Sequence, residues 1–473
     1  MLVAAEASGD ALGAGLARAL KARLGDGVAF VGIGGPRMAA EGVASPFDIA
    51  ELAIVGVTEA LSAYGRVRRR VRETADLAAR ERPDAVVLID SWGFTSRVGK
   101  AIRKASPSTP LIKYVGPQVW ASRPKRARAL AKTADHLLAL YSFDAPWFER
   151  EGLATTVVGS QALNLDLSAA DGAAFRRRHD IDLAAPLLLI LPGSRPGEIA
   201  RMTPVYEETA VRLKAELPEL QIAVVASAMV ETEVRGRVAA WPFRAHLAEE
   251  GEKYDAMKAA DAALATSGTV TLEVAGAGAP MVIAYRIGAI SYAIARRIVT
   301  APFITLFNIA AGREVAPEFI QNAATPERLA SALHRLLTDR EAARRQSEAQ
   351  TAALEAMGRG DHDPSELAAD AVGDHHGRAR HGDFQRHRSA GGEGRVGGLH
   401  GVVLLQLLDQ VGAERPGGDA AAHLRIDHGG GDNRDLQLRQ LGLQPHRRLL
   451  VHRGHPGDLP RPASGQDQQQ GRR

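Results

Sequence analysis

The chain has 473 residues, 45% of them hydrophobic, which is enough to build two or three domains with sizeable cores. It contains no cysteine, and this excludes disulfides, thiolate metal sites and cysteine nucleophiles. The net charge of +4 arises from Asp374 onward, where 15 arginines face 11 acidic side chains, so the neutral remainder gives no electrostatic case for binding nucleic acid. With no apolar run long enough to cross a membrane and no signal peptide, we expect a cytoplasmic protein.

The first half of the chain alternates short apolar runs with helical patterns. After an opening strand and a turn of small residues, positions 12–24 have helical spacing, and positions 66–80 have it again. The apolar runs predict strands at 28–33, 85–90, 111–115, 136–140 and 155–158. Nearly continuous apolar strands separated by helices are typical of a parallel sheet that is covered on both faces.

The second half repeats this alternation after Asn164. The sequence predicts strands at 187–191, 222–226, 262–265 and 281–285, and helical sequence from 326 to 357. We therefore predict an α/β protein with two Rossmann-like domains, residues 1–164 and 165–372, that face a central cleft. Ligands of open α/β sheets bind at the carboxyl ends of the strands, which is where we expect the site.

The segment 373–473 differs in kind from the rest. It is rich in His, Arg and Gly, holds ten of the fifteen histidines, and has no lysine. Its composition favours a disordered tail over a folded extra domain, and its abrupt start after Val372 is also what a shifted reading frame produces. The histidine spacing fits no closed metal site, so we predict no metal there.

A glycine turn at 191–199, LPGSRPGEI, follows the first strand of the second half. A strand that runs into such a turn and then a helix presents backbone N–H groups and the positive end of a helix dipole to the cleft. Ser194 and Arg195 would then bind a diphosphate. The alternative is a turn whose arginine is an ordinary solvated charge.

A second small-residue turn occupies 266–273, TSGTVTLE. Ser267, Gly268 and Thr269 allow a ligand to approach closely, and Glu273, one helical turn further on, can accept hydrogen bonds from the two hydroxyls of a ribose. The alternative is that Glu273 serves only to cap its own helix.

Asp90 ends a central strand of the first half, within the sequence LIDSWGF. A carboxylate at a strand end that faces a cleft can deprotonate a hydroxyl nucleophile. Aspartates at such positions also cap the following helix, and that alternative stays open.

The opening turn at 6–10, EASGD, contains two carboxylates, which would repel a phosphate. Carboxylates and a serine suit the hydroxyl groups of a ligand instead, so we expect Glu6, Ser8 and Asp10 to bind such groups, with Gly9 allowing the backbone to come close. Glu6 could equally be a structural cap.

A basic amphipathic segment spans 55–72. Val55, Val57 and Leu61 are its apolar residues, and Arg66 and Arg69 belong to its basic face. Such a segment can lie on an anionic membrane surface, or it can be a core-facing helix with a solvated arginine face.

Together these motifs are similar to those of the lipid-A-disaccharide synthase family. The matching stretches, in the family's order, are EASGD at 6–10, GGPRM at 34–38, ELAIVG at 51–56, IDS at 89–91, YVGPQVW at 114–120, LPGSR at 191–195, SGTVTLE at 267–273, MVIAYR at 281–286, Asn308, and PEFIQ at 317–321. The resemblance covers residues 1–372 and implies a glycosyltransferase of the GT-B arrangement, with an N-terminal acceptor and lipid domain and a C-terminal UDP-sugar donor domain.

The resemblance also implies a reaction. UDP-2,3-diacylglucosamine would donate its sugar to 2,3-diacylglucosamine 1-phosphate, giving a β-1,6-linked disaccharide and UDP, at the inner-membrane surface and without a metal or other cofactor. It assigns Asp90 as the general base, Arg195 with Ser194 to the leaving UDP, and Glu273 with Asn308 to the nucleotide. The turn at 6–10 would then line the acceptor side of the cleft, where Glu6, Ser8, Gly9 and Asp10 meet the hydroxyls of the acceptor sugar. The rival interpretations are a 2-epimerase-like enzyme of the same architecture and an inactive nucleotide-sugar or lipid-binding protein.

Overall fold

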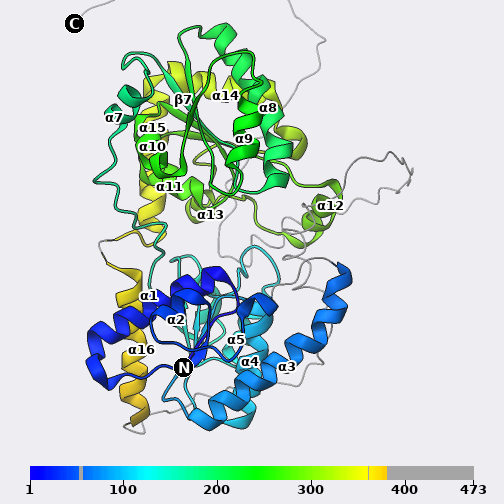
Figure 1. The fold of residues 1–473 in the computed structure, drawn as a ribbon, viewed down its shortest axis with the longest axis vertical. Helices are drawn as coiled ribbons and strands as arrows, with labels where there is room; N and C mark the ends of the chain where they lie inside the picture. Colours follow the sequence, from blue (N-terminus) through cyan, green and yellow to red (C-terminus); the bar gives the residue numbers. More distant parts are fainter. Residues whose placement is uncertain (53–56, 361, 381–473) are drawn as a thin grey trace, which may run out of the picture. The chain divides into compact units, whose positions relative to one another are not determined.

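The computed structural model describes residues 1–52, 57–360 and 362–380, without the side chains of 57–63, 290 and 375–380 (Figure 1). The predicted tail lies outside the described residues from position 381 onward. The predicted boundary near residue 164 falls in the turn between the last strand of one sheet and the first helix of the other half.

The first sheet consists, within the described residues, of six parallel strands in the order β2-β1-β3-β4-β5-β6. Its strands are β1 (Leu2–Val3), β2 (Gly32–Ile33), β3 (Val86–Ile89), β4 (Leu111–Tyr114), β5 (His136–Ala139) and β6 (Ala154–Val157). Every residue of β3, β4 and β5 is buried, as the continuous apolar runs predict. The run at 28–33 forms a strand only at its last two residues.

The second sheet also has six parallel strands in the described part of the chain, in the order β12-β11-β10-β7-β8-β9. They are β7 (Leu187–Leu191), β8 (Gln221–Val225), β9 (His246–Ala248), β10 (Ala262–Thr266), β11 (Met281–Tyr285) and β12 (Glu318–Ile320). Counted from β7, this is the order 3-2-1-4-5-6 of dinucleotide-binding folds read from one edge. The fold is therefore α/β and doubly wound in both halves.

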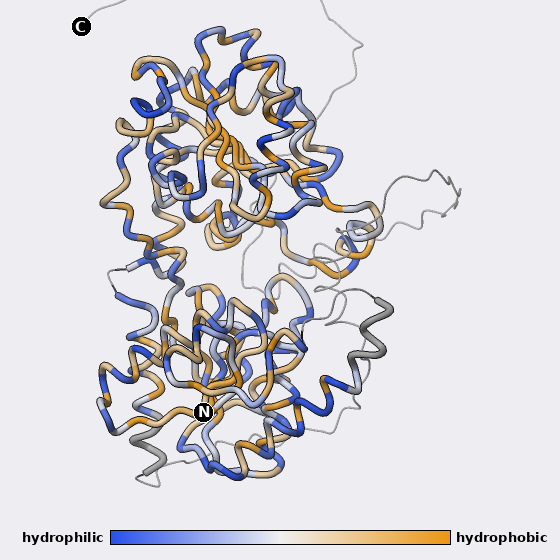
Figure 2. The backbone as a smooth tube through the Cα atoms, viewed as in Figure 1, coloured by the Kyte–Doolittle hydropathy of each residue, from blue (hydrophilic) through white to orange (hydrophobic). Residues whose placement is uncertain are grey.

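Helices cover both faces of the first sheet. Those of this half are α1 (Ala7–Leu24), α2 (Pro36–Ala40), α3 (Val57–Glu81), α4 (Trp92–Ala105), α5 (Lys125–Ala131) and α6 (Ala145–Glu149), with the 3₁₀ turns η1 (Gly25–Gly27) and η2 (Ile49–Leu52). One core cluster joins alternate strand residues to α1, and another joins the remaining strand residues to α3 and α4. Figure 2 shows hydrophobic residues concentrated along the strands at the centre of each half.

Two core clusters enclose the second sheet in the same way, one with α8, α9 and α14 and one with α7, α10, α11, α13 and α15. The elements of this half are α7 (Gly172–Arg178), α8 (Pro196–Glu216), α9 (Glu231–Val238), η3 (Glu250–Glu252), α10 (Lys253–Ala259), α11 (Val270–Gly276), α12 (Ala289–Ile298), α13 (Leu306–Ala311), η4 (Gln321–Ala323), α14 (Pro326–Thr338) and α15 (Arg340–Ala356). The helical sequence predicted at 326–357 forms two helices, with a break at Asp339, whose side chain accepts hydrogen bonds from the N–H groups that begin α15.

The final described helix, α16 (Pro364–Arg380), returns to the first half and packs against α1. Ala368, Ala369 and Val372 are buried in the same cluster as Leu16 and Leu20 of α1. This helix therefore completes the cover of one face of the first sheet.

Each sheet has one pair of neighbouring strands from which the chain continues toward opposite edges of the sheet. This pair is β1 and β3 in the first sheet, and β7 and β10 in the second. Open α/β sheets bind ligands outside the carboxyl ends of the strands at such a pair. The segments that follow these four strands are the predicted motifs at 6–10, 90–91, 191–195 and 266–269; the first of these was predicted as a turn, but its residues 7–10 form the start of α1. Topology thus brings the motifs together in two pairs.

Candidate active site

The turns after β1 and β3 are joined by two hydrogen bonds between side chains. The hydroxyl of Ser8 donates to Asp90 Oδ2 over 2.9 Å, and the hydroxyl of Ser91 donates to Glu6 Oε1 over 2.8 Å. Two of the residues predicted on the acceptor side, Glu6 and Ser8, therefore hydrogen-bond to the turn that carries the predicted base.

The backbone at Asp90 has an unusual conformation. Asp90 and Ser91 have φ angles of +46° and +34°, in the left-handed region that side chains other than glycine rarely adopt. The N–H of Asp90 still donates to Tyr114 O, 2.8 Å away, so the strand pairing continues up to the turn. The chain then reverses into α4 and leaves the Asp90 carboxylate partly exposed at the sheet edge.

Asp10 has a different position from the one the sequence suggested. It is only 3% exposed, and its carboxylate accepts hydrogen bonds from the N–H groups of Gly35, Arg37 and Met38 at 2.8 to 3.0 Å. Asp10 therefore anchors the glycine turn that begins α2, with both oxygens engaged. Gly9 lies against β3, since a Cβ there would be 3.6 Å from Ile89 O.

The turns after β7 and β10 line a pocket of about 600 Å³, a volume typical of small-molecule sites. Its lining in this half includes Gly193, Ser194, Arg195, Glu198, Ser227, Glu250, Lys253, Ser267, Gly268, Thr269, Glu273 and Tyr285. Six of the predicted donor-side residues are in this set.

The turn before α8 is shaped by a buried glutamate. Glu198 accepts from the N–H of Ser194 at 3.1 Å and from the hydroxyl of Tyr285 at 3.4 Å. Gly193, with φ of +116°, passes so close that a Cβ would be 2.7 Å from Glu198 Oε2, so only glycine fits there. Ser194 and Arg195 are left exposed where the positive end of the 21-residue α8 meets the pocket, an arrangement suited to an anion.

Glu273 is held by a cation that the sequence did not single out. Lys253 Nζ lies 2.8 Å from Glu273 Oε2 and both side chains line the pocket. Burial disfavours the ammonium charge of Lys253, but its contact with Glu273 outweighs this effect, and the pKa of Lys253 is raised. A charged lysine therefore faces the nucleotide-sized pocket beside the carboxylate predicted to bind ribose.

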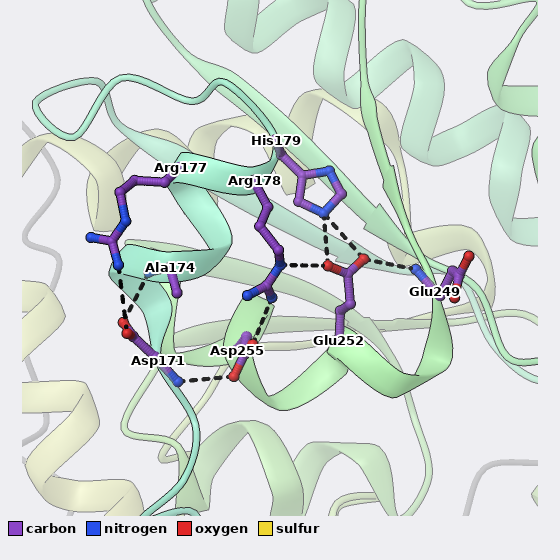
Figure 3. Close-up of polar contacts among 8 residues, drawn as sticks. All are labelled: Asp171, Ala174, Arg177, Arg178, His179, Glu249, Glu252 and Asp255. Carbon is purple, nitrogen blue, oxygen red and sulfur yellow. Dashed lines mark hydrogen bonds and ion pairs between the residues drawn. The ribbon is translucent and has the colours of Figure 1, made fainter.

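An ion-pair network holds the segment that carries Lys253 (Figure 3). From the end of α7, Arg178 contacts Glu252 at 3.0 Å and Asp255 at 2.6 Å, and His179 lies 3.1 Å from Glu252. On the pocket side of the same segment, Glu250 accepts a hydrogen bond from the N–H of Ala228, after β8. The network thus ties two pocket loops to α7.

Asn308 does not contribute to this pocket lining. Its amide is fully buried and bonds to Glu318, to Ala316 O, and to the N–H groups of Val315 and Ala316. In this arrangement it shapes the loop between α13 and β12, and its role in nucleotide binding stays a prediction.

The predicted membrane segment is described only in part. Val55 lies outside the described residues, as do the side chains of Val57 and Leu61. Arg66 and Arg69 are exposed on α3, as both interpretations require.

In residues 1–52, 57–360 and 362–380, no three His, Asp or Glu side chains gather as a metal site would need. No helix in the same residues is long and apolar enough to span a bilayer.

The fold is shared with solved GT-B proteins. UDP-GlcNAc 2-epimerase from Neisseria meningitidis, solved with UDP-GlcNAc, superposes with a TM-score of 0.50 at 10% identity over 79% of this chain and 98% of its own. The glycotransferase of kitacinnamycin gives a TM-score of 0.50 at 19% identity over 79% and 98%. At this identity the likeness concerns fold alone, and it places the chain in the GT-B class.

Closer relatives define the family. The family described as lipid-A-disaccharide synthetase matches residues 1–372. The chain is 43% identical to the lipid-A-disaccharide synthase of Paramagnetospirillum magneticum over 78% of its length and 96% of the relative's, and 43% identical to that of Rhodospirillum centenum over 78% and 93%. The chain belongs to the lipid-A-disaccharide synthase family, and it is a glycosyltransferase of lipid A biosynthesis, as its motifs predict.

Proposed function

We propose that the chain transfers the sugar of UDP-2,3-diacylglucosamine to the 6-hydroxyl of 2,3-diacylglucosamine 1-phosphate. The products are the β-1,6-linked disaccharide 1-phosphate and UDP. The observation that carries this proposal is the pairing of motifs at two switch points: a carboxylate turn at 6–10 and 90–91, and an anion-binding turn at 191–195 and 266–269.

Asp90 is the general base in this proposal. Its carboxylate takes the proton of the acceptor hydroxyl, whose oxygen attacks the anomeric carbon from the face opposite the diphosphate and so inverts the configuration. Ser8 holds one carboxylate oxygen, which leaves the other for the substrate proton. The hydroxyl-rich surroundings of Glu6, Ser8 and Ser91 suit a sugar acceptor.

Arg195 and the first turn of α8 stabilise the leaving group. As the anomeric bond breaks, negative charge develops on UDP, and a guanidinium and a helix N-terminus aimed at that charge lower the barrier. The carboxylates of Glu198, Glu250 and Glu273 in the pocket each bind a protein donor, so in this proposal they do not hold a metal ion. Arg195 and the helix N-terminus then supply the positive charge that balances the diphosphate. We therefore propose a reaction that needs no divalent metal ion, and the test is full turnover in EDTA.

The substrates suggest a location. Their acyl chains partition into lipid, so we propose that the protein works in the cytoplasm at the inner-membrane surface, with Arg66 and Arg69 facing anionic headgroups. Sedimentation of the full chain with anionic vesicles, but not with neutral ones, is the expected result.

The decisive experiment incubates the full chain with both acylated substrates and measures UDP and disaccharide. We expect both products in equal amounts, with about hundredfold losses in kcat for Asp90→Asn and Arg195→Ala. Asp76→Asn and Arg235→Ala change the same charges at exposed positions of α3 and α9 and should retain activity. Near wild-type turnover by both site variants would refute the mechanism.

The same experiment separates the rivals. UDP release or sugar isomerisation without an acceptor would indicate an epimerase-like or hydrolytic enzyme of this fold. Binding of UDP-sugar without any product would indicate an inactive binding protein.

A further inference from the structure

Lys113 is a charged residue in the middle of the buried strand β4. It is only 2% exposed, and the residues on both sides of it, Ile112 and Tyr114, are fully buried. A lysine amine at such a position must find hydrogen-bond acceptors inside the protein, because leaving it without partners would be costly.

The acceptors that Lys113 finds belong to the strand end and turn that carry Asp90 and to the first turn of α4, which follows. Its Nζ donates to Leu88 O over 3.1 Å, to Asp90 O at close range, and to Thr95 Oγ1 over 3.1 Å. The hydroxyl of Thr95 in turn lies 2.8 Å from Asp90 O and 3.0 Å from Ser91 O. The carbonyl groups of Asp90 and Ser91, the two left-handed residues, thus accept hydrogen bonds from buried side chains.

These contacts fall where the backbone needs support. Two successive residues other than glycine with positive φ persist only when the surroundings over-determine them. The hydroxyls of Ser8 and Ser91 donate to carboxylate side chains, so they restrain side chains around the turn. Lys113 and Thr95 donate to a carbonyl group of the turn, so they restrain its main chain.

We propose that Lys113 is a positioning residue for Asp90: its buried amine holds the main chain of the β3–α4 turn in the left-handed conformation that directs the carboxylate toward the acceptor. Lys113 touches no substrate, since its side chain is buried beneath the turn. This inference rests on the proposed role of Asp90 as the base.

The positioning does not depend on the charge of the amine. An ammonium group donates to all three acceptors. A neutral amine keeps two N–H groups for Leu88 O and Asp90 O, so the hydrogen bond to Asp90 O persists in both states, while the single hydroxyl proton of Thr95 is then shared between the amine and the carbonyl groups of the turn. Replacement by methionine gives an unbranched side chain of similar length and removes all three hydrogen bonds of the amine. Replacement by arginine keeps hydrogen-bond donors, but the space beside the side chain, lined by Trp92, Lys100 and Leu130, is only about 10 Å³, so the longer arginine must displace its neighbours.

The test compares Lys113→Met with Lys113→Arg and with Arg176→Met. Arg176 is a matched control in the second half, because its guanidinium is also buried and also donates to backbone carbonyls, those of Asp182, Ala185 and Ala259. We expect Lys113→Met to lower kcat about a hundredfold with little change in KM for the UDP-sugar, and Lys113→Arg to recover part of that loss. Arg176→Met should lower thermal stability comparably and keep kcat.

A second readout does not need turnover. Hydrogen exchange of the peptide over 88–96 should be roughly tenfold faster in Lys113→Met than in wild type, and unchanged in Arg176→Met. If Lys113→Met does not fold, Thr95→Val removes the shared hydroxyl, and we expect faster exchange in this peptide together with a kcat loss of about tenfold.

The outcomes are distinct. Unchanged exchange at 88–96 in a folded variant, or kcat within about twofold of wild type, overturns the inference, as does an equal kcat loss in Arg176→Met. A wild-type chain that makes no disaccharide refutes the proposed function instead, and exchange at 88–96 then decides the role of Lys113 by itself.

Discussion

The buried amine of Lys113 predicts how the stability of the first half depends on pH. Burial lowers the pKa of Lys113 from 10.5 to about 7, although the nearby carboxylates of Asp90 and Glu6 oppose this shift. In the unfolded chain the lysine keeps its proton up to its usual pKa. Between these two values the unfolded state therefore binds more protons than the folded state, and the free energy of unfolding rises with pH.

The size of this effect follows from the difference in pKa. One group with this shift changes the free energy of unfolding by at most about 1.4 kcal/mol per pH unit, and by about 2 kcal/mol in total between pH 7 and 9. Below pH 7 the lysine is charged in both states and the dependence ends. Other groups also titrate, so the informative quantity is the difference between wild type and Lys113→Met.

Urea unfolding followed by tryptophan fluorescence measures this difference. Trp92, Trp120 and Trp147 lie in the first half and Trp241 alone in the second, so the signal mainly reports the relevant sheet. We expect the stability of wild type relative to Lys113→Met to increase by about 2 kcal/mol from pH 7 to 9. Lys104→Met, at an exposed position of α4, makes the same substitution and should show no such slope. A difference that stays constant across this range would refute the assignment of a depressed lysine pKa.

Three further predictions concern the pocket and the last helix. Lys253→Met removes the ion pair of Glu273 and should weaken UDP binding about tenfold by calorimetry, and unchanged affinity would show that the pair is dispensable. Gly193→Ala places a Cβ 2.7 Å from the carboxylate of Glu198 at positive φ, so UDP affinity should fall about tenfold; a normal affinity would mean that the turn yields freely. Ala368→Asp buries a charge between α16 and α1 and should destabilise the protein by about 3 kcal/mol in urea unfolding, whereas wild-type stability would contradict the described packing.

Much of the fold was predictable from local sequence. The strands at 187–191 and 281–285 agree with the structure to the residue, because buried parallel strands need continuous apolar runs and glycine turns mark their ends. The strands β9 and β12 were missed, since their residues are few and partly exposed and carry no such run. The helix break at Asp339 was also missed, because periodicity continues on both sides of it.

The turns of the candidate site could be predicted from the sequence, but the side chains that hold those turns in place could not. A carboxylate or arginine at a strand end is visible in one short motif, as for Asp90 and Arg195. The partner of Glu273 lies twenty residues away on α10, and no spacing rule links them. Lys113 did carry a signal, a cation inside an apolar strand, but the acceptors that give it a role come from a different strand and helix.

The sequence by itself therefore determined the two α/β halves, the family, and the turns proposed to carry the chemistry, because each of these depends on contiguous patterns of polarity and glycine. Only the tertiary structure decided which of the polar groups the protein itself engages. Asp10 turned inward to the N–H groups of another turn, Glu198 and Asn308 were engaged by the protein, and Lys113 was placed beneath Asp90. Such partners are set by strand order, which brings residues far apart in the chain to the same sheet edge.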